Sequence, residues 1–454
     1  MVTRLLIDSC EVVVTMNDAG AEITGGSILI QDGRIAWVGT GEAPDGGAGA
    51  ERIDGRGCVA LPGLVNTHHH LYQTMTRGRA QGRGLFDWLV ELYPVWARLD
   101  EEWVRVAARV ALAELALSGC STTTDHHYVF PPGRGDLLAA EVDAAREIGL
   151  RFHPCRGSMD LGRSSGGLPP DELVEDTDAA LTRSEEDAAR FHDPSPSSML
   201  RIAIAPCSPF SVSERLMTES ASLARRLGVR LHTHIAETLD EERHCRERFG
   251  RGPLEQLDEW GWLGPDVWLA HCVHLGEKDV RRVAETGTGV AWCPSSNLRL
   301  GSGIAPARAL LDEGAPVGLG VDGSASNDSG NLLAEARQAM LVARAGGDAG
   351  ALSPREALRA ATRGGARCLG RDEIGLLRPG ARADVALFAV DDLAHAGFEA
   401  DPVAGLVLAA PARVRHLLVE GRRVVRDHRL VHADEDAIAR EGHRVARRIA
   451  AEAG

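Results

Sequence analysis

No two cysteines in the sequence are spaced as CxxC, and the nine cysteines are scattered along the chain in odd number. This pattern excludes a disulfide framework like that of small secreted domains and predicts reduced thiols. No run of about 18 apolar residues occurs, so the sequence predicts no membrane span. Asp8 and Glu11 interrupt the apolar start of the chain, which makes it a poor signal peptide. We therefore expect a cytoplasmic protein.

Basic residues are also in deficit: 50 Lys and Arg stand against 65 Asp and Glu, a net charge of −15. A protein that follows the phosphates of a nucleic acid usually has a basic face, so we expect no nucleic-acid partner. The 44% of hydrophobic and 25% of charged residues are ordinary for a globular protein and suffice for a large core.

Eight short apolar runs alternate with long amphipathic segments through the middle of the chain, as in βα units with a parallel sheet. The first run is "CVALPGLVNTHHH" and the last is "PVGLGVDGS". Eight such units over about 300 residues predict an α/β fold, a (β/α)₈ TIM barrel. An open doubly wound sheet would more often have a glycine-rich phosphate turn after its first strand, where this chain has histidines.

The two ends of the chain differ from its middle, because short β-branched runs are separated there by glycine-rich turns. We expect these ends to form one small β-sandwich domain from residues 1–60 and 371–432. The catalytic barrel would then span 61–370, and 433–454 would be a solvated C-terminal helix.

Polar residues suited to metal binding stand at the carboxyl ends of the predicted strands, where barrels of this type build their active sites. The first strand ends in "HHH" at 68–70 and the second in "DHH" at 125–127. The fifth carries "HTHIAE" at 232–237, the sixth "HCVH" at 271–274, and the eighth ends in Asp322. A single histidine is most often a packed core or surface residue, but this pattern at several strand ends indicates a metal site.

Side chains alternate along a strand, so His68 and His70 face one way and His69 the other. His68 and His70 can therefore bind one metal ion at the barrel mouth, while His69 faces the surrounding helices. The same rule places both histidines of "HTH" on one face, with Glu237 beyond the strand end. Neutral imidazoles and a carboxylate suit Zn²⁺, and Fe²⁺ would also fit.

Three other classes of protein are disfavoured. A zinc deaminase of the cytidine type needs HxE followed by PCxxC, and neither "PCRGS" nor "PCSPF" has the second cysteine. Hydrolysis of cyclic amides usually uses two metals bridged by a carbamylated lysine on the fourth strand, and "RIAIAPCSP" has no lysine. A non-enzymatic scaffold would be expected to have lost metal ligands, and this chain retains them.

Nearly the whole chain resembles the amidohydrolase superfamily, in its branch of nucleobase deaminases and triazine hydrolases, through "LPGLVNTHHH", "HTHIAET", "LAHCVHL", "GLGVDG" and "GLLRPGARADVALF". Within that branch, "NTHHHLYQTMTRG", "LFDWLVELYPVWARLD" and "CRGSMDLGRSSGGLPPDELVE" are similar to bacterial 8-oxoguanine deaminases. The resemblance implies one divalent metal ion, usually zinc, with the ligands His68, His70, His234 and Asp322. It also implies that Glu237 and His271 handle protons.

This set of residues suits the hydrolytic removal of an amino group from a ring carbon flanked by nitrogens. A bound metal lowers the pKa of water to roughly 7. Asp322 can take the proton of that water, and His271 can hydrogen-bond to the developing oxygen. Glu237 can then protonate the ring nitrogen next to the attacked carbon.

Four residues are candidates for substrate contacts: Gln73, Arg156, Cys207 and His127. In deaminases of this branch, a glutamine at the position of Gln73 faces the purine ring. Guanine deaminases have an arginine near the end of the fourth strand, where this chain has Cys207, and this disfavours plain guanine. Arg156 ends the third strand, where a recognition role and a structural ion pair stay open. Only one of His126 and His127 can face the mouth, and we take His127 as the candidate.

Trp88 and Trp96 have helical spacing and indicate either a core stripe or a substrate lid. Ser296 and Asn297 end the seventh strand, and we expect them to cap the next helix. The predicted reaction is deamination of 8-oxoguanine to urate and ammonia. The same machinery acting on isoxanthopterin or another pterin, on guanine, on a cytosine analogue or on a hydroxylated s-triazine stays open. The expected partners are thus a small heterocyclic substrate and further copies of the chain in a homo-oligomer.

Overall fold

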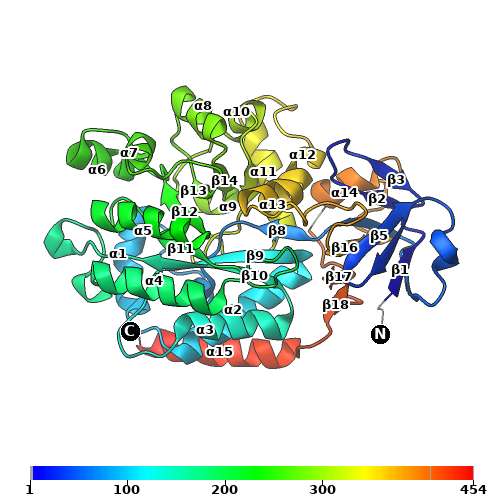
Figure 1. Ribbon diagram of the computed structural model, residues 1–454, viewed down its shortest axis with the longest axis horizontal. Coiled ribbons are helices and arrows are strands. Elements are labelled where there is room, and N and C mark those ends of the chain that lie inside the picture. Colours follow the sequence, from blue (N-terminus) through cyan, green and yellow to red (C-terminus); the bar gives the residue numbers. More distant parts are fainter. Residues whose placement is uncertain (1–3, 410, 453–454) are drawn as a thin grey trace.

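A computed structural model of the protein describes residues 4–409 and 411–452, and its larger part is built around eight parallel strands (Figure 1). The strands pair in chain order. All eight predicted strands are present, so the TIM barrel is confirmed. They are β8 (Leu64–Asn66), β9 (Cys120–His127), β10 (Arg151–Ser158), β11 (Ala203–Pro206), β12 (Arg230–Ile235), β13 (Val267–His271), β14 (Gly289–Trp292) and β15 (Val317–Leu319).

The barrel is nearly closed between β8 and β15, the two ends of the eight-stranded sheet. The backbone N–H of Thr67 donates to the carbonyl oxygen of Leu319 at 3.0 Å, and the Thr67 hydroxyl bonds the same oxygen at 2.9 Å. One step further, the N–H of Asp322 donates to the carbonyl oxygen of His68 at 3.1 Å. These bonds join the first and last strand ends, which carry expected site residues.

Helices follow the strands and cover the barrel; most of their apolar faces lie in one large core, while those of the first helix and of the first turns of the second belong to a second apolar cluster. Side-chain caps start several of them; Ser213 accepts a hydrogen bond from the N–H of Leu216, for example. The helices of the barrel are α1 (Leu85–Trp96), α2 (Glu101–Leu117), α3 (Leu137–Ile148), α4 (Thr177–Phe191), α5 (Glu214–Leu227), α6 (Leu239–Phe249), α7 (Pro253–Glu259), α8 (Glu277–Thr286), α9 (Pro294–Arg299), α10 (Ala307–Asp312), α11 (Leu332–Arg344), α12 (Pro354–Arg359) and α13 (Gly365–Cys368).

Two further sheets stand beside the barrel (Figure 1); the first is built from the N-terminal part of the chain alone, and the second combines strands from both ends. The first is β5-β4-β1-β6, with β1 (Arg4–Asp8), β4 (Ser27–Gln31), β5 (Arg34–Gly39) and β6 (Glu51–Asp54). The second is β19-β18-β17-β16-β7-β2-β3, with β2 (Val12–Val14), β3 (Glu22–Thr24), β7 (Cys58–Pro62), β16 (Val385–Ala389), β17 (His416–Val419), β18 (Arg422–Arg426) and β19 (Arg429–Leu430). They share an apolar core that includes Ile7, Ile30, Val385 and Leu418. The residue limits of the domains stay a prediction.

The first predicted barrel strand is divided between two sheets. Its beginning, β7, pairs with β16 and β2, and only β8 belongs to the barrel. Gly63 lies between them, where a Cβ atom would come within 2.4 Å of the Ser121 side chain. The chain therefore passes from one sheet to the other at a point where only glycine fits without displacing its neighbour.

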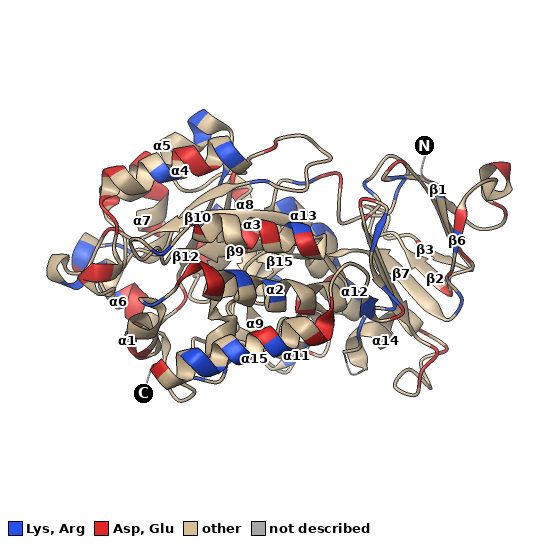
Figure 2. Cartoon of the chain, turned by 90° about the horizontal axis from the view of Figure 1, so that it is seen from below, with Lys and Arg blue, Asp and Glu red and all other residues tan. Residues whose placement is uncertain are grey.

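The last helix, α15 (Glu435–Glu452), packs along α2, as Figures 1 and 2 show. Ile438, Val445 and Ile449 are buried, and Glu441 and Arg448 pair with oppositely charged residues of the α2 region. The predicted solvated helix is thus exposed on one face only. Among the described residues, no helix is long and apolar enough to cross a membrane.

Candidate active site

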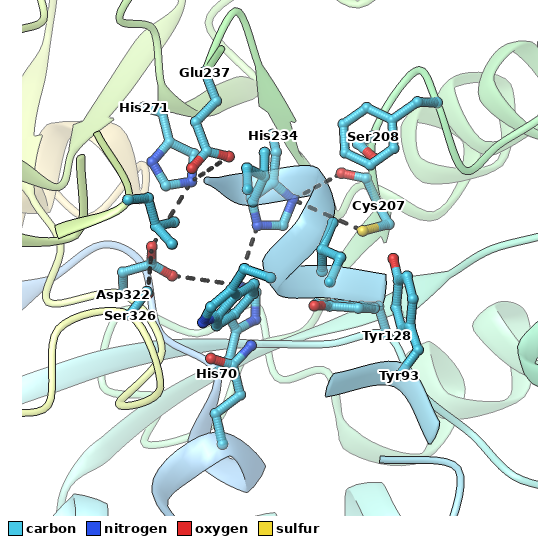
Figure 3. Close-up of a pocket in the computed structure, with 16 residues that line it drawn as sticks. His70, Tyr93, Tyr128, Cys207, Ser208, His234, Glu237, His271, Asp322 and Ser326 are labelled. Carbon is cyan, nitrogen blue, oxygen red and sulfur yellow. Dashed lines mark hydrogen bonds and ion pairs between the residues drawn. The ribbon is translucent and has the colours of Figure 1, made fainter. Parts of the chain in front are cut away.

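Four side chains meet at the carboxyl end of the barrel: His68, His70, His234 and Asp322, the last three of which are shown in Figure 3. Nε2 of His70 lies 3.1 Å from Nε2 of His234, and Oδ1 of Asp322 lies 3.4 Å from Nε2 of both His68 and His70. All four are buried. The structure therefore brings the expected metal ligands together. His69 is buried as well, but neither of its ring nitrogens has a hydrogen-bond partner and its ring contacts none of the other histidines among the described residues.

Hydrogen bonds fix which ring nitrogen of these histidines carries the proton. Nδ1 of His70 lies 2.7 Å from the carbonyl oxygen of His126, and Nδ1 of His234 lies 2.8 Å from that of Cys207. A carbonyl oxygen only accepts, so both Nδ1 atoms donate and both Nε2 atoms keep a lone pair. Burial lowers the pKa of both histidines well below its usual value, which keeps the rings neutral. Neutral, oriented imidazoles beside a carboxylate fit a divalent metal ion.

Glu237 and His271 lie beside this cluster (Figure 3). Oε2 of Glu237 is 3.5 Å from Nε2 of His271, and Oδ2 of Asp322 is 3.9 Å from the same nitrogen. Burial raises the pKa of Glu237 to about 7, against the opposing effect of His271. Burial alone would lower the pKa of His271, but the nearby carboxyl groups of Glu237 and Asp322 outweigh it and raise that pKa. A carboxyl group with a pKa near neutrality beside a histidine can act as a general acid.

The backbone turns sharply where these strands end. Ala236, His271 and Asp322 have φ angles of 51°, 71° and 62°, in the left-handed region that non-glycine residues seldom adopt. Such conformations cost roughly 1–3 kcal/mol each and are found mostly at functional sites. The strained turns aim the side chains of the strand ends into the barrel mouth.

A pocket opens directly above the cluster. One wall comes from α1 and the rest from the loops after the strands; its lining is His70, Gln73, Leu85, Trp88, Leu89, Tyr93, Tyr128, Cys207, Ser208, Phe210, His234, Glu237, His271, Leu300, Asp322 and Ser326. Gln73 is 1% exposed, and neither atom of its amide group has a hydrogen-bond partner. Of the two tryptophans, Trp88 lines the pocket. Trp96 does not, and lies in the core with its ring 5.4 Å from that of Tyr72.

Two expected substrate contacts lie elsewhere. Arg156 is 2% exposed and forms ion pairs with Glu175 at 2.6 Å and Asp187 at 3.5 Å, so its charge is used inside the protein. The His127 ring points toward α3, where Nδ1 lies 2.7 Å from Glu141. Neither residue lines the pocket.

The neighbouring His126 is the residue of that pair that faces the barrel interior, where its ring stacks on His234 at 4.6 Å. Alternation along β9 allowed either residue to face the interior. From the sequence we expected His127 there, and the structure shows that it is His126 instead.

Several residues of the site were not assigned from the sequence. Asn297, expected only as a helix cap, lies within α9 and its Oδ1 is 2.9 Å from Nδ1 of His271. The Ser326 hydroxyl donates to Oδ2 of Asp322 at 3.3 Å. Tyr93 and Tyr128 complete the pocket (Figure 3). Their positions depend on how the loops fold, and Asn297 alone was marked by its place at a strand end.

Comparisons with known proteins agree with this geometry. The model of the amidohydrolase family matches residues 59–424. The chain is 49% identical over 405 residues to an 8-oxoguanine deaminase of Pseudomonas aeruginosa, covering 88% of this chain and 90% of that protein. It is 40% identical over 419 residues to an isoxanthopterin deaminase of an unknown prokaryotic organism, covering 87% of each.

A solved structure is similar over almost the whole length. The crystal structure of an atrazine chlorohydrolase from Arthrobacter aurescens complexed with zinc superposes with a TM-score of 0.93 and 36% identity, covering 97% of this chain and all of that one. The barrel and the motifs that resemble the superfamily lie within the matched region. The expectation from the motifs is confirmed: this chain belongs to the amidohydrolase family.

Proposed function

We propose that the protein is a metal-dependent aminohydrolase that converts 8-oxoguanine and water to urate and ammonia. The observation that carries this proposal is the unpaired amide of Gln73, which faces the same pocket as the proton-handling pair Glu237 and His271. A buried amide with no partner inside the protein is suited to bind a ligand with both donor and acceptor groups. The 49% identity to an 8-oxoguanine deaminase supports this choice of ligand.

One divalent ion, zinc in preference to iron, would be held by the group His68, His70, His234 and Asp322. Such an ion would supply a water acidic enough to attack at neutral pH. The three histidines need no proton loss to bind it, because burial already keeps them neutral.

The chain's own carboxyl groups then move the protons. Asp322 takes a proton from the attacking water while the oxygen of that water bonds to the ring carbon that bears the amino group. Glu237, protonated near pH 7, gives its proton to the adjacent ring nitrogen, so the ring does not accumulate negative charge. The amino group then takes the proton held by Asp322 and leaves as ammonia. The hydroxyl group on the attacked carbon gives its proton to Glu237 and becomes a carbonyl group, which restores both carboxyl groups. His271 hydrogen-bonds to the incoming oxygen and is held for this by Asn297.

Cys207 supports the choice of an oxidised purine. It lines the pocket and is 5% exposed. Guanine deaminases have an arginine at the corresponding position. A thiol is shorter than a guanidinium and carries no charge, so it leaves room for the oxo group on the five-membered ring. The 40% identity to an isoxanthopterin deaminase makes isoxanthopterin the second candidate substrate. The pterin ring also has an amino group on a carbon that is flanked by two ring nitrogens.

The test is an ammonia-release assay on protein of measured metal content, with 8-oxoguanine, guanine, isoxanthopterin and a hydroxylated s-triazine. A site that hydrogen-bonds an extra polar group rejects the analogue that lacks it, so kcat/KM for 8-oxoguanine should exceed that for guanine by at least about 10²-fold. Equal activity on guanine would contradict the argument from Cys207. A preference for isoxanthopterin would move the substrate to the pterins. The cytoplasmic location and the homo-oligomeric state stay predictions.

A further inference from the structure

The proposed metal ligand His68 has a different kind of hydrogen-bond partner from the other two histidine ligands. His70 and His234 bond through Nδ1 to backbone carbonyl oxygens, which no substitution can remove. Nδ1 of His68 instead lies 2.8 Å from Nε2 of His232, a side chain with no exposed surface. The orientation of His68 therefore depends on a side chain that can be exchanged.

The proton between these two rings can be placed from the hydrogen bonds around them. Nδ1 of His232 lies 2.8 Å from the carbonyl oxygen of Trp268, which can only accept, so this Nδ1 carries a proton. His232 is fully buried among Trp268 and other histidines, and no carboxylate forms an ion pair with it among the described residues, so it is neutral and has a single N–H. Its Nε2 is therefore an acceptor, and Nδ1 of His68 donates to it.

This arrangement leaves the lone pair of His68 on Nε2. That nitrogen is buried, has no hydrogen-bond partner and lies 3.4 Å from Oδ1 of Asp322. It thus points at the place where the other proposed ligands meet. If the His68–His232 proton were on the other ring, His68 would place an N–H in that position and could not bind a metal there.

Trp268 holds both histidines. Its indole ring lies flat on the ring of His232, with centroids 4.4 Å apart and an interplanar angle of 12°. Its Nε1 donates to the carbonyl oxygen of Thr67 at 3.0 Å, and Thr67 directly precedes His68. Hydrogen bonds thus run from His68 to His232, from His232 to Trp268 and from Trp268 back to Thr67, next to His68. Neither histidine ring can turn without breaking one of these bonds.

We propose that His232 is a positioning residue for the metal site, which fixes the tautomer and the orientation of His68 and is itself held by Trp268. The inference rests on the proposed metal site and is independent of the substrate. Partners of this kind typically contribute 10–100-fold to metal affinity or activity.

The first test compares the rate at which zinc leaves the zinc-loaded protein for a chromophoric chelator in three variants. His232→Leu removes the acceptor for His68. His232→Gln restores it, because the glutamine amide can accept from His68 and donate to the Trp268 carbonyl. His153→Leu is the matched control, since His153 is a buried barrel histidine whose ring lies 5.6 Å from Trp268 but forms no hydrogen bond.

Zinc should leave His232→Leu at least about tenfold faster than the parent, and leave the other two variants within about threefold of the parent rate. A parent-like rate for His232→Leu, or an equal increase in all three variants, would overturn the proposal. Circular dichroism and thermal unfolding check that each variant is folded.

A second test needs no variant. Neutron diffraction from deuterated crystals of the parent should show deuterium on Nδ1 of His68 and on Nδ1 of His232, and deuterium on Nε2 of His232 would overturn the proposal. A parent that binds no zinc would overturn the metal site and this inference together. Tight zinc binding without deamination of any tested base would contradict only the proposed function.

Discussion

The carboxyl group of Glu237 lies 3.5 Å from Nε2 of His271, and both side chains are almost completely buried. Burial raises the pKa of Glu237 to about 7, so this group holds a proton in weakly acidic and neutral solution. The carboxyl groups of Glu237 and Asp322 raise the pKa of His271. In the proposed function, this pair would exchange a proton with a bound ring near neutral pH.

The first prediction concerns pH. If protonated Glu237 is the acid, kcat/KM should fall as the pH rises through about 7, because the folded-state pKa is raised and ionisation removes the donor. Glu237→Gln should keep its metal and lose roughly 10²–10⁴-fold in turnover. Initial rates from weakly acidic to weakly alkaline pH test both statements. A profile that stays flat through neutral pH, or a variant as active as the parent, would assign the proton to another group.

The second prediction separates adjacent histidines. His70→Gln should lose the metal ion, since Nε2 of His70 faces both His234 and Asp322. His69→Gln should retain it, because His69 contacts none of these groups. Elemental analysis of the two purified variants measures this directly. Equal metal content in both would show that the ligands are assigned wrongly.

The third prediction concerns Gln73, whose amide has no partner in the described structure. Gln73→Leu keeps the side-chain volume but removes both polar groups. It should lower kcat/KM about 10²-fold while the metal content stays the same, because the loss affects only bonds to the substrate. Gln81→Leu, an exposed change in the same loop, is the control. The prediction fails if the two variants have the same kinetics.

The fourth prediction concerns Arg156. Its guanidinium is buried and paired with Glu175 and Asp187, so Arg156→Met leaves two carboxylates without their cation. Removing one partner of a buried ion pair costs roughly 3–5 kcal/mol, and we expect a loss of this size in urea unfolding. KM of the folded variant should change less than about threefold, since Arg156 does not line the pocket. A large rise in KM without loss of stability would restore the recognition role.

The convergence of the proposed metal ligands could be predicted from the sequence better than the lining of the pocket, for physical reasons. Alternation along a strand fixes that His68 and His70 share a side, and the positions of strand ends in a barrel bring His234 and Asp322 to them. Alternation gives relative orientation only, so it could not decide between His126 and His127, both of which are polar, buried and plausible.

Other features depend on contacts between distant segments. The apolar run before the histidines is continuous, although it serves two sheets, and only the packing of Gly63 against Ser121 shows where it divides. Asn297 is one polar residue after a strand, and its bond to His271 arises from the direction of α9. Such contacts leave no periodic signal in the sequence.

The meeting of the two chain ends has a consequence for biosynthesis. β7 lies between β2 and β16, so one edge of the seven-stranded sheet remains open until the ribosome has made most of the chain. The part of α2 that contacts α15 stays uncovered longer still, because α15 is synthesised long after α2. A truncated product would therefore expose a sheet edge and an apolar helix face, the features by which chaperones and proteases recognise unfinished chains. An interruption of translation would thus leave exposed those surfaces that later segments of the chain cover in the folded protein.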